Sequence, residues 1–188
     1  MTTRDRQREE TKKRIYDCAF QLFEKKGFDN VKVQDIAKAA GISIGGLYHH
    51  YRSKADIIDF GYFTFDEQLE EQYQTQKFKS PREGIEALIR FQMQTCVDTG
   101  VEIISITFRN QINAENHYRY SEDRYLTKQL IANLKKAGLD EAKQKQVAEA
   151  LLRTARGYVY DWCCRKGSFD LVGATLEQVD IILAYYQI

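Results

Sequence analysis

The sequence is almost free of proline. Pro81 is the only proline among 188 residues, whereas Ala, Leu, Lys, Glu and Gln are frequent. Proline is the residue that disfavours a helix interior most strongly, and the frequent residues are all good helix formers. The chain is therefore predicted to be all-α, with about nine helices placed by apolar periodicity and capping signals.

The first clear helix lies upstream of Gly27. Apolar residues recur there at spacings of three and four, in the series Ile15, Cys18, Ala19, Leu22 and Phe23. This spacing places them on one face of an amphipathic helix. Gly27 suits the left-handed conformation that commonly ends a helix, so the helix is expected to stop there.

Two short helices are expected next, at residues 33–40 and 44–51. Gly41 lies between them and lets the chain turn without a Cβ clash. Ser43 is a good N-cap for the second helix. Two short helices joined by a tight turn form a helix-turn-helix.

Capping boxes place the later helices. The sequence Ser-Lys-Ala-Asp at Ser53 is expected to open one long helix that continues to Leu69. Residues 101–108 are rich in β-branched side chains, but an isolated strand would lack a partner, so a helix is expected there too. The other expected helices span residues 81–98, 117–136 and 141–166, and a last helix opens at a Thr175 capping box.

Charge is distributed unevenly along the chain. Residues 1–60 carry 12 Lys/Arg and 9 Asp/Glu, whereas the remaining residues carry 16 and 18. A basic N-terminal part favours a polyanionic partner, with an ordinary solvated surface as the alternative. Since no apolar run could span a bilayer and charged residues follow Met1 closely, a cytoplasmic protein without membrane contact is expected.

Catalytic and metal-binding signatures are absent from the sequence. The four cysteines lack metal-ligand spacing, and no paired carboxylates, nucleophile elbow or phosphate-binding glycine loop occurs. The chain is therefore expected to have no metal, no cofactor and no enzymatic activity. A redox role for the adjacent Cys163 and Cys164 is a minor alternative, because exposed thiolates are reactive.

A set of motif residues occupies the helix-turn-helix region: Gly27-Phe28, Ile36-Ala37, Ala40-Gly41, Ser43-Ile44-Gly45, Leu47-Tyr48, Tyr51 and Ser53-Lys54. Over residues 10–60 the chain resembles the DNA-binding module of the TetR family of bacterial repressors. The resemblance implies a three-helix DNA-binding domain at residues 1–53 and a C-terminal ligand-binding and dimerisation domain at residues 54–188. It implies a homodimeric repressor that a small molecule releases from a palindromic operator. Activation of transcription is the alternative to repression.

Motif position and chemistry together select the residues expected to contact double-stranded DNA. Tyr48 and His49 can donate hydrogen bonds to phosphates or base acceptors, and Lys54 is expected to hold a phosphate. Lys32 stands where related proteins often have a capping Thr; either Asn30 caps that helix, or Lys32 keeps a phosphate contact through its charge. The predicted contacts are Lys32, Gln34, Ser43, Ile44, Gly45, Gly46, Tyr48, His49 and Lys54.

The recognition helix itself carries few groups that could specify bases. No Arg or Lys lies between Ser43 and Tyr51, so guanine recognition by a bidentate cationic side chain is not expected there. DNA shape and phosphate contacts are expected to contribute more of the affinity. A protein that has kept this fold but lost DNA affinity is the main alternative, because Gly45 and Gly46 have no side chains that could contact bases.

The C-terminal part is expected to dimerise and to bind an unidentified small molecule. Abundant apolar residues in the last two helices favour a four-helix dimer bundle, with a monomer core as the alternative. The effector is expected to act through the helix from Ser53 to Leu69, by changing the separation of the two recognition helices. The predicted pocket residues are Phe63, Gln92, Phe108, Arg109, Tyr125, Tyr158 and Trp162.

Overall fold

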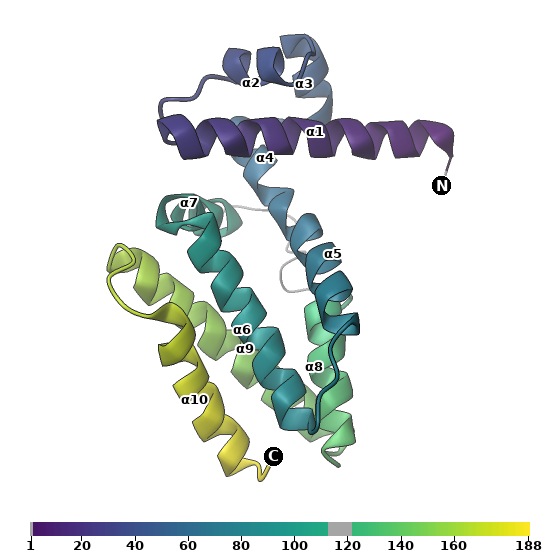
Figure 1. The fold of residues 1–188 in the computed structure, drawn as a ribbon, viewed down its shortest axis with the longest axis vertical. Coiled ribbons are helices and arrows are strands. Elements are labelled where there is room, and N and C mark those ends of the chain that lie inside the picture. Colours follow the sequence, from purple (N-terminus) through teal and green to yellow (C-terminus); the bar gives the residue numbers. More distant parts are fainter. Residues whose placement is uncertain (1, 113–121) are drawn as a thin grey trace. The chain divides into compact units, whose positions relative to one another are not determined.

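A computed structural model describes residues 2–112 and 122–188 (Figure 1). All secondary structure in these residues is helical, which confirms the predicted fold class. The chain divides into two compact units, Met1–Tyr62 and Phe63–Ile188. This division falls after Tyr62, whereas the sequence analysis placed a domain boundary after Ser53.

The N-terminal unit contains α1 (Thr3–Lys26), α2 (Val33–Ala39), α3 (Ile44–His50) and α4 (Lys54–Asp59). The buried face of α1 carries the predicted apolar residues Ile15, Ala19 and Phe23. Its core partners include Ile36 of α2 and Leu47 of α3, both fully buried. Since α4 also packs on α1 and buries Ile57 and Ile58, it belongs to this unit.

The long helix expected from Ser53 through Leu69 is interrupted, which corrects the prediction. Phe60 ends α4, and α5 (Gly61–Gln74) begins at the next residue. The ring of Phe60 lies between those of Tyr16 and Tyr51, with centroids 5.6 and 6.1 Å away. A Cβ at Gly61 would lie 2.9 Å from the Tyr16 hydroxyl, so this close packing explains the glycine next to the break. The split gives ten described helices where about nine were expected.

The C-terminal unit is built around α6 (Pro81–Thr99), which Figure 1 shows between α8 (Tyr125–Lys136) and α10 (Leu171–Tyr185). The remaining helices are α7 (Val101–Ile112) and α9 (Glu141–Cys164). α7 confirms that the β-branched segment is helical. The expected start of α8 near residue 117 lies outside the described residues.

The core of this unit is formed by apolar side chains from α6, α8, α9 and α10. Leu88, Leu130, Leu151 and Val179 are fully buried in it. The apolar residues of the last two helices that suggested a dimer bundle either lie in this core or are partly buried against it. They are Val147, Leu151, Leu152, Ala155, Val159, Trp162, Leu176, Val179, Ile182, Leu183 and Tyr186.

The last helix begins earlier than the sequence analysis predicted. Asp170 caps α10 by accepting a hydrogen bond from the Gly173 amide at 3.0 Å. Thr175, the predicted cap, lies fully buried inside the helix, where its hydroxyl donates to the Leu171 carbonyl. The apolar Leu171 side chain joins the core, which explains why the helix extends beyond the Thr175 box.

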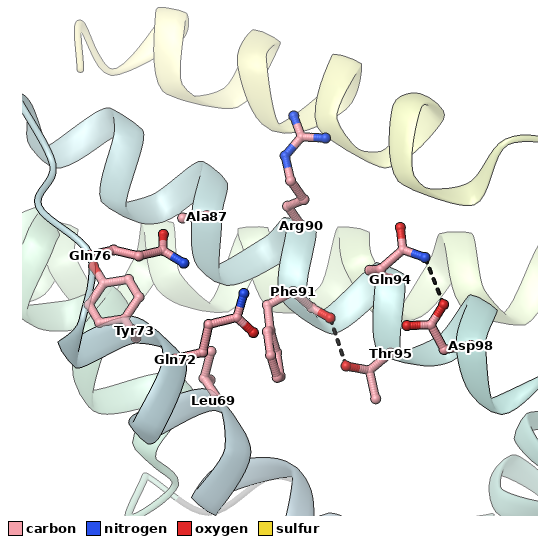
Figure 2. Close-up of a pocket in the computed structure, with 10 residues that line it drawn as sticks. All are labelled: Leu69, Gln72, Tyr73, Gln76, Ala87, Arg90, Phe91, Gln94, Thr95 and Asp98. Atoms are coloured by element: carbon pink, nitrogen blue, oxygen red, sulfur yellow. Dashed lines mark hydrogen bonds between the residues drawn. The ribbon is translucent and has the colours of Figure 1, made fainter.

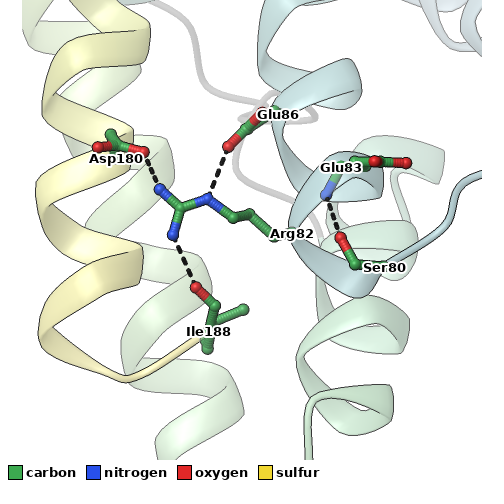
Figure 3. Close-up of polar contacts among 6 residues, drawn as sticks. All are labelled: Ser80, Arg82, Glu83, Glu86, Asp180 and Ile188. Atoms are coloured by element: carbon green, nitrogen blue, oxygen red, sulfur yellow. Dashed lines mark hydrogen bonds and ion pairs between the residues drawn. The ribbon is translucent and has the colours of Figure 1, made fainter.

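Arg82 joins the start of α6 to the end of the chain (Figure 3). Its guanidinium donates to Glu86 at 3.0 Å and to the Ile188 carbonyl at 2.8 Å, and it pairs with Asp180 of α10. A planar guanidinium can hold several acceptors in fixed directions, so this cluster sets the position of α10 on α6. No helix in the described part of the chain is long and apolar enough to cross a membrane.

Candidate nucleic-acid interface

The turn between α2 and α3 is held by backbone hydrogen bonds. The Gly41 amide donates to Lys38 at 3.2 Å, and the Ile42 amide donates to Ala37 at 3.0 Å. Gly41 has a φ of +66°, in the left-handed region that glycine tolerates best. Ser43 then caps α3, because its hydroxyl accepts from the Gly46 amide at 3.0 Å.

α3 has one buried face and one exposed face. Leu47 is fully buried, and Tyr51, which follows the helix, is 4% exposed. Burial raises the pKa of Tyr51, and its hydroxyl donates to the Lys12 carbonyl of α1 at 3.0 Å. On the other face, Ile44 is 42% and Tyr48 is 52% exposed. The helix thus presents apolar and aromatic surface outward from a rigid attachment to α1.

The predicted DNA contacts on α3 fall on this outward face. Ser43, Gly45 and His49 are exposed together with Ile44 and Tyr48, and Gly46 is half-buried. The structure therefore brings six of the nine predicted residues together on one short helix and its cap. Such a convex helix face has the shape that a major groove admits.

Asp35, not Asn30, caps the start of α2. Its carboxylate accepts a hydrogen bond from the Lys32 amide at 3.1 Å. Asn30 instead donates to the Lys26 carbonyl at the end of α1, so the proposed Asn30 cap is wrong. The Lys32 and Gln34 side chains are exposed. A carboxylate at the third helical position can accept from the backbone amide of the N-cap residue even when that residue is lysine, a signal that sequence reasoning missed.

Lys54 is held inside the N-terminal unit. Its ammonium group donates to the carbonyl oxygens of Phe28 and Val31, the latter at 2.9 Å, and lies 4.0 Å from the centre of the Phe28 ring. These contacts tie α4 to the loop between α1 and α2. The predicted phosphate contact of Lys54 therefore depends on its backbone amide, at the N-terminus of α4, more than on its side-chain charge.

His50 lies at the end of α3 beside cations of α1. Burial lowers the pKa of His50, and the charges of His49, Arg8 and Lys12 lower it further, against an opposing effect of Glu9. The buried Nδ1 atom has no hydrogen-bond partner among the described residues. The neutral imidazole is the favoured form at this position.

The predicted pocket residues are dispersed over the C-terminal unit. The ring of Tyr125 lies beside that of Tyr73 in α5, with centroids 6.4 Å apart. The ring of Phe108 instead lies near that of Tyr160 in α9, with centroids 6.5 Å apart. Trp162 is buried next to Gly167. The others are Gln92 and Tyr158, both half-buried, Arg109, which is exposed, and Phe63, whose side chain lies outside the described residues.

A cleft of about 400 Å³ lies between α5 and α6 (Figure 2). Its apolar lining residues are Leu69, Tyr73, Ala87 and Phe91, and its polar ones are Gln72, Gln76, Arg90, Gln94, Thr95 and Asp98. None of the seven predicted pocket residues lines this cleft. Sequence reasoning missed it because the cleft forms only where α5 packs on α6, and no local pattern shows which side chains line the space between them.

The C-terminal unit also exposes large apolar side chains that sequence reasoning did not single out. Tyr160 of α9 is 60% exposed, and Ile181 and Tyr185 of α10 are 59% and 79% exposed. Gly157 of α9 has nothing within 4 Å of the place a Cβ would occupy. These residues remain outside the core of one copy, and they are the apolar surface that a partner helix could cover.

The fold and the exposed α3 face together define a helix-turn-helix protein with a helical C-terminal unit. Residues 15–59 match the family described as bacterial regulatory proteins, tetR family. This match covers the helix-turn-helix part of the chain, where the motif residues indicated the same family.

Relatives and solved structures agree with this assignment. The chain is 25% identical over 103 residues to an HTH-type transcriptional regulator of Staphylococcus aureus strain USA300, covering 48% of this chain and 55% of that protein. The match thus spans about half of the relative's length. These proteins are transcriptional regulators and not enzymes, in agreement with the prediction from sequence.

Two similar crystal structures share the fold over nearly the whole chain. Thermus thermophilus FadR, a TetR-family repressor in complex with lauroyl-CoA, has a TM-score of 0.70 and 18% identity, covering 92% of this chain and 93% of that one. Bacillus subtilis FadR, in complex with stearoyl-CoA, has a TM-score of 0.61 and 19% identity, covering 90% and 96%. The likeness extends the fold assignment to the C-terminal unit.

Proposed function

We propose that this protein is a DNA-binding transcriptional regulator that acts in the cytoplasm as a homodimer. It represses from a palindromic operator and is released by a small molecule. The observation that carries the proposal is the exposed face of α3, where Ile44 and Tyr48 lie outward while Leu47 anchors the helix. Exposing an aromatic and a branched apolar side chain on so short a helix is unfavourable unless a partner covers them.

DNA fits this face better than a protein partner does. Two glycines, Gly45 and Gly46, lower the helix surface and allow a close approach to the groove floor. Tyr48 and His49 supply hydrogen-bond donors for phosphates or bases, and Ile44 can contact a thymine methyl group. Lys32 and Gln34 extend the contacts along α2, and the Lys54 amide adds a phosphate contact at the start of α4.

A homodimer is supported by the apolar surface of α9 and α10. Tyr160, Ile181 and Tyr185 are exposed in one copy, and the bare Gly157 allows a second helix to approach closely. In a two-fold dimer the two α3 helices would enter successive major grooves one DNA turn apart, about 34 Å, which requires a palindromic site. Substituting Ile181 by Lys should convert the dimer to monomers in analytical ultracentrifugation.

The effector is proposed to be a small molecule bound in the C-terminal unit. Gln92 has a buried side-chain oxygen without a hydrogen-bond partner among the described residues, so a donor on a ligand could satisfy it. Similar folds were crystallised with lauroyl-CoA and stearoyl-CoA, which makes acyl-CoA thioesters the first compounds to test. A ligand that prefers one separation of the two α3 helices would shift operator affinity.

The test is selection of bound duplexes from a random library, followed by fluorescence anisotropy on the selected site. The expected result is a two-fold symmetric sequence whose binding weakens in Tyr48→Phe or His49→Ala, with thermal unfolding unchanged because both side chains are exposed. Addition of the effector should release the duplex. A library that yields no enriched sequence, together with no salt-dependent binding, would favour a protein that has lost DNA affinity.

A further inference from the structure

The first helix continues well beyond the part that packs in the N-terminal unit. α1 begins at Thr3, and its side chains from Thr3 to Glu10 are all exposed. Figure 1 shows this N-terminal part of α1 projecting past α3. Over these residues the helix has no packing that would require it to form.

A complete capping box nevertheless starts the projecting segment. The Thr2 hydroxyl accepts from the Asp5 amide at 3.2 Å, and the Asp5 carboxylate accepts from the Thr2 amide at 2.8 Å. A capping box satisfies two backbone groups that the first turn would otherwise leave to water. The sequence therefore stabilises a helix here that contributes nothing to the core.

One face of α1 changes from apolar to cationic side chains at the point where other helices no longer pack on it. Ile15, Ala19 and Phe23 form its buried stripe. The same face continues towards the N-terminus through Lys12, Arg8 and Arg4, because steps of three and four residues return to one side of a helix. The stripe is thus apolar where helices cover it and cationic where it is uncovered.

This cationic stripe begins beside the end of α3. The Tyr51 hydroxyl bonds the carbonyl of Lys12, so Lys12 lies next to the residue that follows the recognition helix. Arg8 and Lys12 are also close enough to His50 to influence its titration. From Lys12 to Arg4 the helix advances about 12 Å, at 1.5 Å per residue, which is comparable to the width of a major groove.

Two acidic residues lie near the stripe, and the hydrogen bonds of Asp5 with Thr2, followed by the charge of Arg8, contribute to lowering the pKa of Asp5. Glu9 lies 3.5 Å from Lys12, and Asp5 is engaged in the cap with Thr2. Neither Arg4 nor Arg8 forms an ion pair within the described part of the chain. Both side chains are exposed, and without an ion pair their guanidinium groups can bind an external anion.

We propose that Arg4, Arg8 and Lys12 extend the DNA interface along α1 and bind backbone phosphates that flank the site entered by α3. The inference rests on the proposed function, since it requires α3 to dock on DNA. Charge complementarity identifies the partner: a row of cations spaced one helical turn apart matches the regularly spaced phosphates at a groove edge. These contacts supply affinity, and they partly compensate for the absence of cations on α3.

The test compares two charge-matched double variants of the full-length protein. Arg4→Gln with Arg8→Gln removes two charges from the stripe, whereas Arg6→Gln with Lys13→Gln removes two charges from roughly the opposite face of the same helix. Binding to a random-sequence duplex is measured by fluorescence anisotropy over a series of salt concentrations. Circular dichroism checks that both variants keep their helices, as expected for exposed positions.

The slope of log K against log salt is the discriminating quantity, because each phosphate contact contributes about 0.9 to it. The stripe variant should lose about 1.8 units of slope and bind more weakly. The control variant should keep a slope close to that of the unmodified protein. Arg4→Lys with Arg8→Lys should restore the slope, since lysine keeps the charge.

Two outcomes would overturn the inference while leaving the proposed function intact. In one, the unmodified protein binds DNA with a steep slope and the stripe variant keeps it. In the other, both double variants lose equal slope, which would show a general effect of net charge. Absence of salt-dependent binding by the unmodified protein would overturn the proposed function, and this inference with it.

Discussion

The ammonium group of Lys54 lies 2.9 Å from the carbonyl oxygen of Val31 and donates a hydrogen bond to it. A second bond to Phe28 gives this cation two acceptors in the loop between α1 and α2. A motif residue expected to meet DNA through its charge therefore also holds the DNA-binding unit together.

Substitution of Lys54 by Met should destabilise the N-terminal unit by about 1 to 3 kcal/mol, because two partly buried carbonyl groups lose a charged donor. Thermal unfolding followed by circular dichroism measures the change. Lys38→Met, at an exposed position of α2, is the matched control and should change stability by less than about 0.5 kcal/mol. Equal effects of the two substitutions would contradict the structural role of Lys54.

A substitution at Gly45 should have opposite effects on the stability of α3 and on its affinity for DNA. A Cβ at Gly45 would come no closer than 4.0 Å to Ser43, so Gly45→Ala should stabilise α3 by about 0.5 to 1 kcal/mol. Its methyl group would project from the exposed face and weaken binding to the selected duplex. At Gly46 a Cβ would lie 3.3 Å from the Ser43 hydroxyl, so Gly46→Ala should stabilise less.

Thermal unfolding and anisotropy on the same samples test this prediction. Tighter DNA binding by the more stable Gly45→Ala protein would contradict the prediction. It would show that Gly45 makes α3 flexible and is not needed for a close approach of α3 to DNA.

His50 should make the N-terminal unit sensitive to acid. Burial and the charges of His49, Arg8 and Lys12, opposed by Glu9, hold the pKa of His50 below its ordinary value of 6.5. Below pH 6.5 the unfolded chain therefore binds a proton that the folded unit takes up only at lower pH. The stability contributed by neutral His50 is complete above pH 6.5 and is lost as the pH falls towards the folded-state pKa.

Denaturant unfolding at a series of pH values between 5 and 8 measures the effect, in steps chosen to bracket the ordinary histidine pKa of about 6.5. His50→Gln should flatten the loss of stability below pH 6.5 relative to the unmodified protein. An identical pH dependence in both proteins would contradict the prediction.

The fold was largely predictable because its signals are local. Gly27, Ser43 and Ser53 end or cap helices in the structure where the sequence placed them. The break at Phe60 was not predictable, because it depends on aromatic rings from α1 and from the residue after α3. The start of α10 also depends on tertiary packing. Asp170 caps the helix in place of Thr175, because the earlier start lets Leu171 be buried in the core.

The candidate site was predictable in part for a related reason. Exposure of Tyr48 and burial of Leu47 follow from helical spacing and motif position. The internal role of Lys54 depends on carbonyl groups more than twenty residues away, which no local pattern reveals. The cleft between α5 and α6 likewise exists only once two helices have packed.

Gly84 marks a close approach between helices of the C-terminal unit. A Cβ there would lie 2.5 Å from the Asn133 side-chain oxygen and 2.7 Å from the Tyr73 hydroxyl. These two side chains are themselves hydrogen-bonded at 2.8 Å, and Asn133 also donates to the Gln129 carbonyl at 2.7 Å. Alanine at this position of α6 must therefore displace a polar pair that joins α5 and α8.

Gly84→Ala should destabilise the C-terminal unit by about 1 to 3 kcal/mol, although alanine is the better helix former. Tyr73→Phe should cost less, about 1 kcal/mol, because it removes one hydrogen bond without a clash. In the double variant the two effects should not add, since losing the Tyr73 hydroxyl removes one clash and also frees Asn133 to move away from the methyl group. Thermal unfolding of the four proteins completes this cycle, and strict additivity would show that the Tyr73 hydroxyl is not what excludes a side chain at Gly84.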